Sequence, residues 1–219
     1  MKVAIDGPAG AGKSTIARML AGALGFTYID SGAMYRCVAL ASRERGIAPD
    51  DSESLGRLAE GLEITFAPAE NGQSVALDGA DVTQAIRTPD ISALASRVSV
   101  HPQVRSAMVA LQRAMGARVD CVMEGRDIGS VVFPDAEKKV FLTASPAERA
   151  RRRWEDLKAR GECDLTLDEV LVDLTERDRR DAERETSPLV RAEGAIEVIT
   201  DGLTPAELIQ KLVEWVRTP

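Results

Sequence analysis

The chain has 219 residues, of which 44% are hydrophobic and 29% are charged, and its formal net charge is −7. A chain of this length can bury a sizeable hydrophobic core as one compact unit. It has no apolar run of the roughly 18 residues that a membrane span needs, so we expect no membrane partner. The acidic balance argues against broad, nonspecific binding of nucleic acid, which needs a basic surface.

Cysteine and histidine, which often serve as catalytic residues or metal ligands, are scarce in this chain. Cys37, Cys121 and Cys163 lie far apart with no C-x-x-C pair, which argues against a disulfide framework or a zinc knuckle, and we expect reduced thiols. His101 is the only histidine and precedes a proline, so it is read as the boundary of a helix rather than as a catalytic base or metal ligand. Residues 1–6 enter a strand-like run without a secretion signal, and the expected location is the cytoplasm.

Strands and helices alternate over most of the sequence. In the first part we predict strands over 1–6 and 27–30, and helices over 14–24, 33–45 and 54–62. In the second part we predict helices over 89–100, 102–117, 146–160, 166–184 and 205–216, and strands over 119–124, 138–144 and 195–200. Residues 63–83 differ, because short alternating runs around Asn71-Gly72 predict a small antiparallel insertion with a hairpin. The alternation elsewhere predicts an α/β fold with a buried parallel sheet and helices on both faces.

The most specific motif follows the first predicted strand directly. Gly7, Gly12, Lys13 and Ser14 fit G-x-x-x-x-G-K-[ST] between a strand and a helix, the context in which this motif forms a phosphate-binding P-loop. The backbone N–H groups and the helix N-terminus would cradle phosphates, Lys13 would reach the β and γ phosphates, and the Ser14 hydroxyl would ligate Mg²⁺. The alternative, an accidental glycine-rich turn, is disfavoured by this context.

The motif identifies a phosphate-binding P-loop protein but does not specify the reaction. GTPases read guanine with an N-K-x-D segment, but the single asparagine of this chain is Asn71, which Gly72 follows. Motor ATPases and helicases need a polymer-binding surface, for which an acidic chain of this size offers no candidate. A phosphotransferase acting on a small molecule remains.

Arginines cluster in two predicted helices. Arg177, Arg180, Asp181 and Arg184 are spaced i, i+3, i+4, i+7 and therefore share one helix face, while Arg149, Arg152 and Arg153 lie on the helix before it. Phosphoryl transfer between two anions needs such cations, and arginine binds phosphate bidentately. A solvated charged face with internal ion pairs explains the same pattern, and both alternatives stay open.

A second motif ends the predicted strand at 119–124. Glu124, Gly125, Arg126 and Asp127 follow its apolar residues, at the end of a strand where open α/β sheets bind ligands. Glu124 would orient Mg²⁺ through water, Arg126 would contact phosphate, and Asp127 would face the acceptor. The alternative is a turn held by a salt bridge.

Six segments in order carry a resemblance to a known family: "GPAGAGKST", "DSGAMYR", "IRTPDI", "EGRDIG", "VVFPDA" and "ERDRRDAERETSPL". Together they resemble bacterial cytidylate kinase over nearly the whole chain. The resemblance implies a P-loop core formed by 1–30, 101–150 and 185–219. It also implies an acceptor domain over 31–100, enlarged by a small sheet at about 63–84, and a helical lid over 151–180.

The resemblance also implies the reaction and its site residues. ATP would donate a phosphoryl group to CMP or dCMP with Mg²⁺ as cofactor, in a monomeric enzyme of pyrimidine metabolism. ATP would be bound by Gly7, Pro8, Ala9, Gly10, Ala11, Gly12, Lys13, Ser14, Thr15 and Arg152. CMP would be bound by Ser31, Tyr35, Arg36, Ser96, Arg105, Arg126, Asp127, Arg177, Asp181 and Arg184. The catalytic cations would be Lys13, Arg126, Arg177 and Arg184.

Some alternatives remain at this point. The alternative for Tyr35 is a packing role, and Arg149 or Arg153 is the alternative to Arg152 over the donor nucleotide. Glu124 departs from the aspartate that some members of the family have at this place, which weakens its assignment to the metal. Another P-loop kinase of small metabolites, of the sugar-acid or shikimate type, is the competing enzyme, and an ATP-binding regulatory module is the competing non-enzyme.

Overall fold

The structure is a computed structural model that describes residues 1–69, 72–161 and 164–218. It divides into two compact units, Met1–Tyr28 with Val119–Pro219, and Ile29–Arg118. None of the helices in the described ranges is long and apolar enough to cross a membrane. The two units are described separately below.

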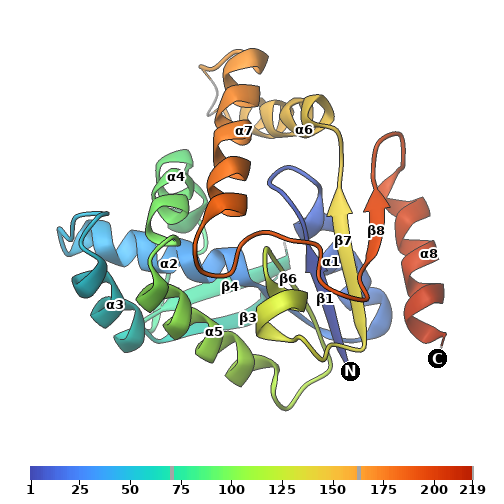
Figure 1. Cartoon of the computed structure of the whole chain (residues 1–219), viewed down its shortest axis with the longest axis horizontal. Coiled ribbons are helices and arrows are strands. Elements are labelled where there is room, and N and C mark those ends of the chain that lie inside the picture. The colour runs from blue at the N-terminus through green and yellow to red at the C-terminus, as the bar shows by residue number, and fades with distance from the viewer. Residues whose placement is uncertain (70–71, 162–163, 219) are drawn as a thin grey trace. The chain divides into compact units, whose positions relative to one another are not determined.

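The first unit is built on a parallel sheet (Figure 1). The strand order is β2 (Thr27–Asp30), β6 (Cys121–Gly125), β1 (Lys2–Asp6), β7 (Lys138–Thr143) and β8 (Ile196–Ile199), and the first residues of β2 belong to this unit. The central strands β1 and β6 each contain a run of three fully buried apolar residues, 3–5 and 121–123, as expected for strands covered on both faces. The parallel order brings the carboxyl ends of β1, β6 and β7 to one edge.

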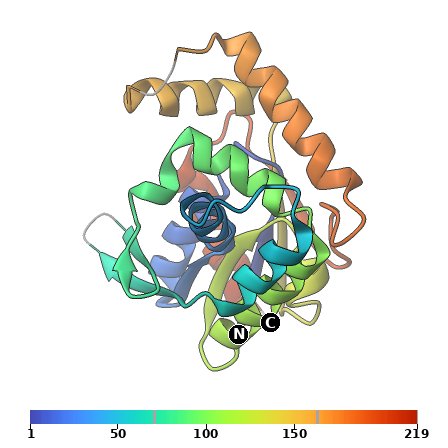
Figure 2. The same ribbon diagram turned by 90° about the vertical axis from the view of Figure 1, so that its left-hand side faces the viewer.

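Helices cover this sheet and extend beyond it. α1 (Lys13–Leu24) and α8 (Pro205–Arg217) share a hydrophobic core with β1, β6 and β7. α6 (Pro146–Ala159) and α7 (Leu167–Glu183) pack against each other through a separate small core (Figure 2). Thr166 begins α7 with a capping box, in which its side chain and that of Glu169 bond each other's backbone N–H groups. A short π-helical turn, η2 (Ile128–Val132), follows β6.

The second unit is mainly helical. It contains α2 (Ser31–Glu44), α3 (Ser52–Gly61), the 3-10 turn η1 (Ala85–Arg87), α4 (Pro89–Val98) and α5 (Pro102–Gly116). A three-stranded antiparallel sheet joins them, in the order β3 (Ile64–Ala69), β4 (Gly72–Leu77) and β5 (Ala80–Asp81). The predicted insertion at 63–83 is therefore confirmed as a small sheet, while Glu70 and Asn71 of the predicted hairpin turn lie outside the described residues.

The predicted elements are present, with shifted ends. α2 begins at Ser31 and not at Ala33, because the Asp30 side chain caps it by accepting the N–H of Ala33. The two short turns η1 and η2 were not predicted. His101 occupies the N-cap position of α5, as expected for a boundary residue, and its Nε2 lies 2.7 Å from the carbonyl oxygen of Pro49.

The predicted division into a core, an acceptor domain over 31–100 and a lid over 151–180 stays a prediction. α5 packs against α3 and belongs to the second compact unit. Cys37 and Cys121 are buried free thiols, and burial raises the pKa of Cys37 to about 12. Cys163 lies outside the described residues.

Candidate active site

The P-loop connects β1 to α1 through a backbone that only glycine accommodates at key points. Gly7 has φ +147°, and a Cβ there would overlap the carbonyl oxygen of Leu142 on β7. Gly10 has φ +76°, and a Cβ there would lie 2.9 Å from the carbonyl oxygen of Arg149. Gly12 takes the left-handed conformation at the N-cap of α1. The loop is therefore held close to the ends of β7 and α6, with the N-terminus of α1 behind it.

Lys13 is a buried cation at the start of α1. Its side chain is 6% exposed, and its Nζ donates to the carbonyl oxygen of Pro8 at 2.7 Å. Burial, and after it the neighbouring Arg126, lower the pKa of Lys13 to about 7, while Glu124 opposes the shift. An anion bound at this loop would compensate the unfavourable positive charge. Ser14 and Thr15, which follow, are exposed.

Glu124 lies in β6, one residue before the strand ends. It is 4% exposed, and its Oε1 accepts a hydrogen bond from the Tyr28 hydroxyl at 2.9 Å. Its carboxylate and the Ser14 hydroxyl are the hard oxygen donors that Mg²⁺ prefers, so these residues fit the ion. The described residues contain no group of three or more His, Cys, Asp or Glu side chains that would hold a metal, and Mg²⁺ bound mainly through phosphate and water needs none.

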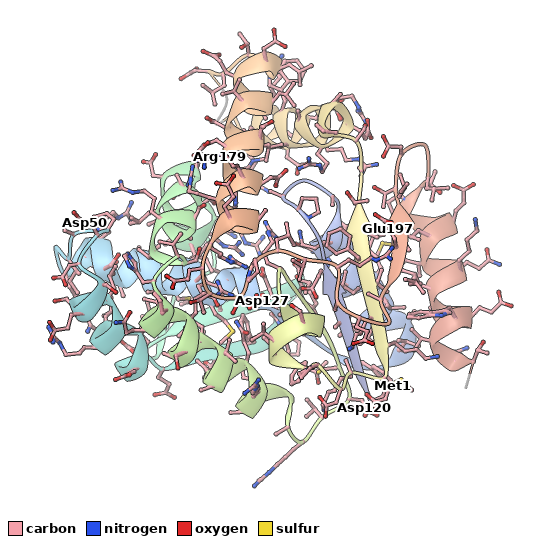
Figure 3. All side chains as sticks on the ribbon, viewed as in Figure 1. Met1, Asp50, Asp120, Asp127, Arg179 and Glu197 are labelled. Atoms are coloured by element: carbon pink, nitrogen blue, oxygen red, sulfur yellow. The ribbon has the colours of Figure 1, made fainter. Side chains whose placement is uncertain are left out.

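A cluster of two arginines and two carboxylates lies where β6 ends and α7 ends. Arg126 donates from Nε to Asp181 at 2.9 Å, and Arg184 lies 3.4 Å from Asp181 and 3.9 Å from Asp127. Figure 3 shows Asp127 near the lower end of α7. Burial opposes ionisation of Asp181 most strongly, but Arg126, Arg177 and Arg184 keep its pKa below the usual value. The structure thus brings together four predicted acceptor residues.

The remaining arginines of α7 separate into two kinds. Arg177 acts electrostatically on Lys13 and Asp181, toward the site. Arg180 pairs with Glu176 near the surface, and the exposed Arg179 pairs with Glu176 and Glu183. The alternative of a solvated charged face therefore fits Arg180, and does not fit the buried Arg184.

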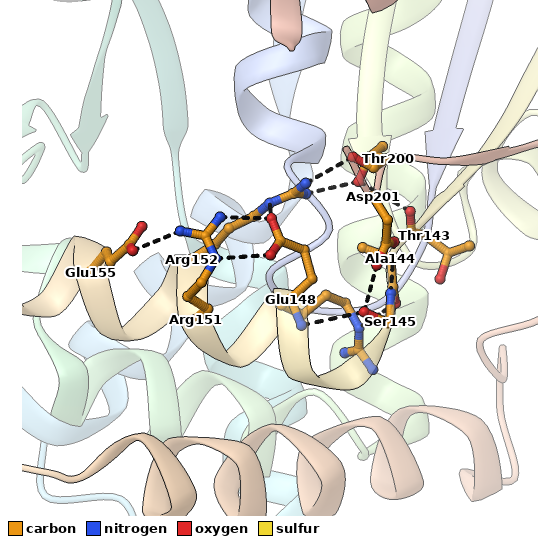
Figure 4. Close-up of polar contacts among 10 residues, drawn as sticks. Thr143, Ala144, Ser145, Glu148, Arg151, Arg152, Glu155, Thr200 and Asp201 are labelled. Atoms are coloured by element: carbon orange, nitrogen blue, oxygen red, sulfur yellow. Dashed lines mark hydrogen bonds and ion pairs between the residues drawn. The ribbon is translucent and has the colours of Figure 1, made fainter. Parts of the chain in front are cut away.

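The arginines of α6 are also occupied by protein groups. Figure 4 shows Arg152, whose Nε donates to Glu148 at 2.8 Å and whose Nη1 and Nη2 donate to the hydroxyl and carbonyl of Thr200 at 2.8 and 2.9 Å. Arg152 Nη1 would lie 3.8 Å from a Cβ at Gly12. Arg152 is therefore next to the P-loop.

Arg149 donates a hydrogen bond to the backbone of the P-loop. It is 7% exposed, and its Nη1 donates to the carbonyl oxygen of Ala9 at 3.1 Å and to Asp178 of α7 at 2.5 Å. Its Nε donates to the carbonyl oxygen of Ala144 at 3.1 Å. Arg149 links β7, the P-loop and α7, and these contacts distinguish it from Arg152.

The second unit gathers another set of predicted residues. Arg105 is 1% exposed, lies 5.3 Å from the ring centroid of Tyr35, and donates from Nη1 to the carbonyl oxygen of Ser99 at 3.1 Å. Ser96 and Ser31 are buried. Tyr35 thus packs against Arg105, as the alternative of a packing role for Tyr35 expects. The same contact is compatible with a role of Tyr35 in binding the acceptor.

Arg36 is held within the second unit by the residue that caps α2. Its Nη2 donates to Asp30 Oδ2 at 2.8 Å. This ion pair fixes the guanidinium one turn into the helix, so the predicted role of Arg36 toward an acceptor phosphate stays a prediction.

Sequence reasoning missed one buried acid beside the P-loop. Asp6 is the last residue of β1 and is 3% exposed, and its two carboxylate oxygens accept the N–H groups of Ile128 and Gly129. Burial raises the pKa of Asp6 to about 6, against the effect of these two hydrogen bonds. Its place at a strand end, directly before the first loop glycine, was the available signal.

Comparison with known proteins decides the family. The family model for cytidylate kinase matches residues 3–218. The chain belongs to the cytidylate kinase family. It is 49% identical to the cytidylate kinase of Carboxydothermus hydrogenoformans over 99% of this chain and 97% of that one.

Other comparisons extend this result. The chain is 50% identical over 98% of its length to a bifunctional pantoate ligase/cytidylate kinase of Prochlorococcus marinus, but it spans only 43% of that protein. An uncharacterized protein of Eubacterium ventriosum has a related fold, with a TM-score of 0.53 at 9% identity over 100% of this chain and 99% of that one. The α/β fold with a parallel core and a small antiparallel sheet is confirmed for this member of the cytidylate kinase family.

Proposed function

We propose that this chain transfers the γ-phosphoryl group of ATP to CMP or dCMP, giving ADP and CDP or dCDP. Membership of the cytidylate kinase family supports the proposal. The observation that carries it is the convergence of cations on Lys13, whose pKa is lowered by burial and then by Arg126 and Arg177. Glu124 and Asp181 offset part of this positive charge. A bound anion would offset the rest, and we assign that role to the transferring phosphoryl group.

The donor end of the proposed site is the P-loop. The N–H groups of residues 7–15 and the N-terminus of α1 would hold the ATP phosphates, with Lys13 on the β and γ oxygens. Ser14 and Glu124 would hold Mg²⁺, which supplies charge neutralisation on the polyphosphate. Arg152, already placed near Gly12, would lie against the donor nucleotide.

The acceptor needs no general base. The second pKa of a nucleoside monophosphate is about 6, so its phosphate oxygens are already anionic nucleophiles at neutral pH. Catalysis then consists of alignment and electrostatic stabilisation by Lys13, Arg126, Arg177 and Arg184. This explains how a chain whose one histidine lies at the N-cap position of a helix can serve as a phosphotransferase.

Base recognition follows from hydrogen-bonding chemistry. The N4 amine of cytosine donates to a carboxylate, for which we propose Asp127, while its O2 and N3 accept from Arg105 and Ser96. Uracil carries an acceptor at position 4 and would face the Asp127 carboxylate unfavourably. Ser31, Tyr35, Arg36, Arg126 and Arg184 would contact the sugar and phosphate, and Arg177 with Asp181 the ribose hydroxyls.

The proposal includes a lid and a cellular role. Helices over 151–180 would cover the donor and exclude water, so that ATP is not simply hydrolysed. Pyrimidine metabolism in the cytoplasm, by a monomer, belongs to the same proposal.

A panel of acceptors tests the reaction. The purified chain is mixed with ATP and Mg²⁺, and ADP release is followed with CMP, dCMP, UMP, AMP and shikimate. We expect rapid release with CMP and dCMP, slow release with UMP, background with AMP and shikimate, and loss of transfer when EDTA removes Mg²⁺. Release dependent on shikimate would support the competing kinase, and ATP binding without any acceptor-dependent release would support a regulatory module.

A further inference from the structure

The buried Asp6 makes contacts that the proposed reaction does not use. Its Oδ1 accepts the N–H of Ile128 at 2.8 Å, and its Oδ2 accepts the N–H of Gly129 at 2.7 Å. These are the first N–H groups of η2, which have no partner within the turn. A carboxylate from another strand therefore caps this turn, because the first N–H groups of a helical turn attract negative charge.

Asp6 also constrains the residue that precedes the Arg126–Asp127 segment. β1 and β6 pair in register so that Asp6 lies opposite Gly125. Backbone pairing thus fixes the residue before Arg126, and the Asp6 side chain fixes the two residues after Asp127. Asp6 therefore contacts the chain both before and after Arg126 and Asp127, the two residues that we propose contact the acceptor.

The space around this contact is small. A Cβ at Gly129 would lie 3.4 Å from Asp6 Oδ2 and 3.3 Å from both the Ala192 Cβ and the Lys139 Cδ. The turn has little room to move away from the carboxylate. A side chain without two acceptor oxygens would leave a buried backbone N–H without its partner, which is costly in this environment.

We propose that Asp6 is a positioning residue that fixes the segment carrying Arg126 and Asp127, and through it the acceptor nucleotide. The inference rests on the proposed function. It differs from a role for Asp6 on ATP or its metal, because both carboxylate oxygens are directed to the backbone of the acceptor-contacting segment.

The test replaces Asp6 by asparagine, which keeps the size but sets an amide NH₂ against a backbone N–H. KM for CMP, KM for ATP, kcat, and the ratio of kcat/KM for CMP over UMP are measured for Asp6→Asn. Asp51→Asn is the matched control, since Asp51 caps α3 by accepting the N–H of Ser54 and belongs to no proposed site. Thermal unfolding of each variant is followed by circular dichroism.

For Asp6→Asn we expect KM for CMP to rise about tenfold, the scale of one lost charged hydrogen bond, and the preference for CMP over UMP to fall. KM for ATP should stay within about twofold of the unmodified chain. An equal rise in both KM values, or unchanged CMP parameters, would overturn the role of Asp6.

A second variant covers the case in which Asp6→Asn does not fold. Asp6→Glu keeps two acceptor oxygens but moves them outward by one methylene, so it should shift KM for CMP while sparing KM for ATP. The same two contrary outcomes overturn the proposal. An unmodified chain that does not phosphorylate CMP refutes the proposed function, whereas an active chain with silent Asp6 variants refutes only this inference.

Discussion

Arg126 and Asp181 are joined by a hydrogen bond of 2.9 Å between Nε and Oδ2, linking the turn after β6 to the last turns of α7. Both side chains are largely buried, and Arg184 approaches the second oxygen of Asp181 at 3.4 Å. One carboxylate therefore orients two guanidinium groups that we assign to phosphate. Without it, these cations would repel each other and turn toward other acceptors.

Asp181→Asn should lower kcat/KM for CMP by a factor of about 10 to 100, because a charged, buried hydrogen bond is lost and Arg126 is no longer oriented. The protein should retain its fold, since the amide keeps one acceptor oxygen. Steady-state kinetics measure the effect. Asp173→Asn, on an exposed position of the same helix, is the control, and equal kinetics in the two variants would contradict the role of Asp181.

Lys13→Met should abolish transfer and yet stabilise the nucleotide-free chain. The folded pKa of Lys13, about 7, lies below the ordinary value of 10.5 because burial penalises the ammonium group. The penalty is therefore full below pH 7 and fades as pH rises from 7 toward 10.5. At pH 6 we expect the free energy of unfolding to increase by more than about 1.4 kcal/mol, the equivalent of one pKa unit.

Urea unfolding at pH 6 and pH 10 checks this prediction. The gain from Lys13→Met should shrink at the higher pH, while Lys211→Met, which removes an exposed lysine from α8, should give no comparable gain at either pH. A destabilised Lys13→Met chain at pH 6 would mean that the bond to Pro8 outweighs the cost of burying the charge.

Asp127→Asn should reduce the preference for CMP over UMP. An amide at this position offers an N–H donor to O4 of uracil as well as an acceptor to N4 of cytosine. Initial rates with the two acceptors give the ratio of kcat/KM. The residue is 4% exposed, and its Oδ1 lies 3.9 Å from Arg184 Nη2, so acceptor affinity should also change. An unaltered ratio would remove Asp127 from base recognition.

Much of the fold could be predicted because the local signals agree with the tertiary structure. The buried runs of β1 and β6, the glycine at the end of α1 and the threonine caps of α7 and α8 each act within a few residues. Helix ends were displaced where a cap lay outside the apolar pattern, as Asp30 does for α2. The turn η2 was missed because the carboxylate that accepts its first N–H groups belongs to Asp6, which is distant in sequence.

The site was predictable to the level of motifs but not of contacts. The P-loop could be predicted because its residues are contiguous in the sequence. The pairing of Arg126 with Asp181 could not be predicted from such a pattern, because the two residues are 55 positions apart. Spacing placed Arg180 and Arg184 on one face of α7, yet only Arg184 is buried. Burial depends on what packs against each position, and helical periodicity alone does not contain that information.

The last prediction concerns Gly7, the P-loop residue that packs closely against the Leu142 carbonyl. Gly7→Ala should destabilise the chain by at least about 2 kcal/mol, because its Cβ would overlap the Leu142 carbonyl in a core that cannot expand freely. The backbone adds to the cost, since φ is +147°, a conformation that L-residues rarely adopt. Binding of ATP should weaken as well, because the loop cannot relax without moving its N–H groups.

Gly22→Ala is the matched control for this substitution. Gly22 lies in α1, and a Cβ there meets no atom within 4 Å, so alanine should stabilise the chain by about 0.5 kcal/mol through its higher helix propensity. Chemical unfolding and ATP titration separate the two variants. If Gly7→Ala matched Gly22→Ala in stability and ATP affinity, the close packing of the loop against β7 would not be what holds the phosphate cradle in shape.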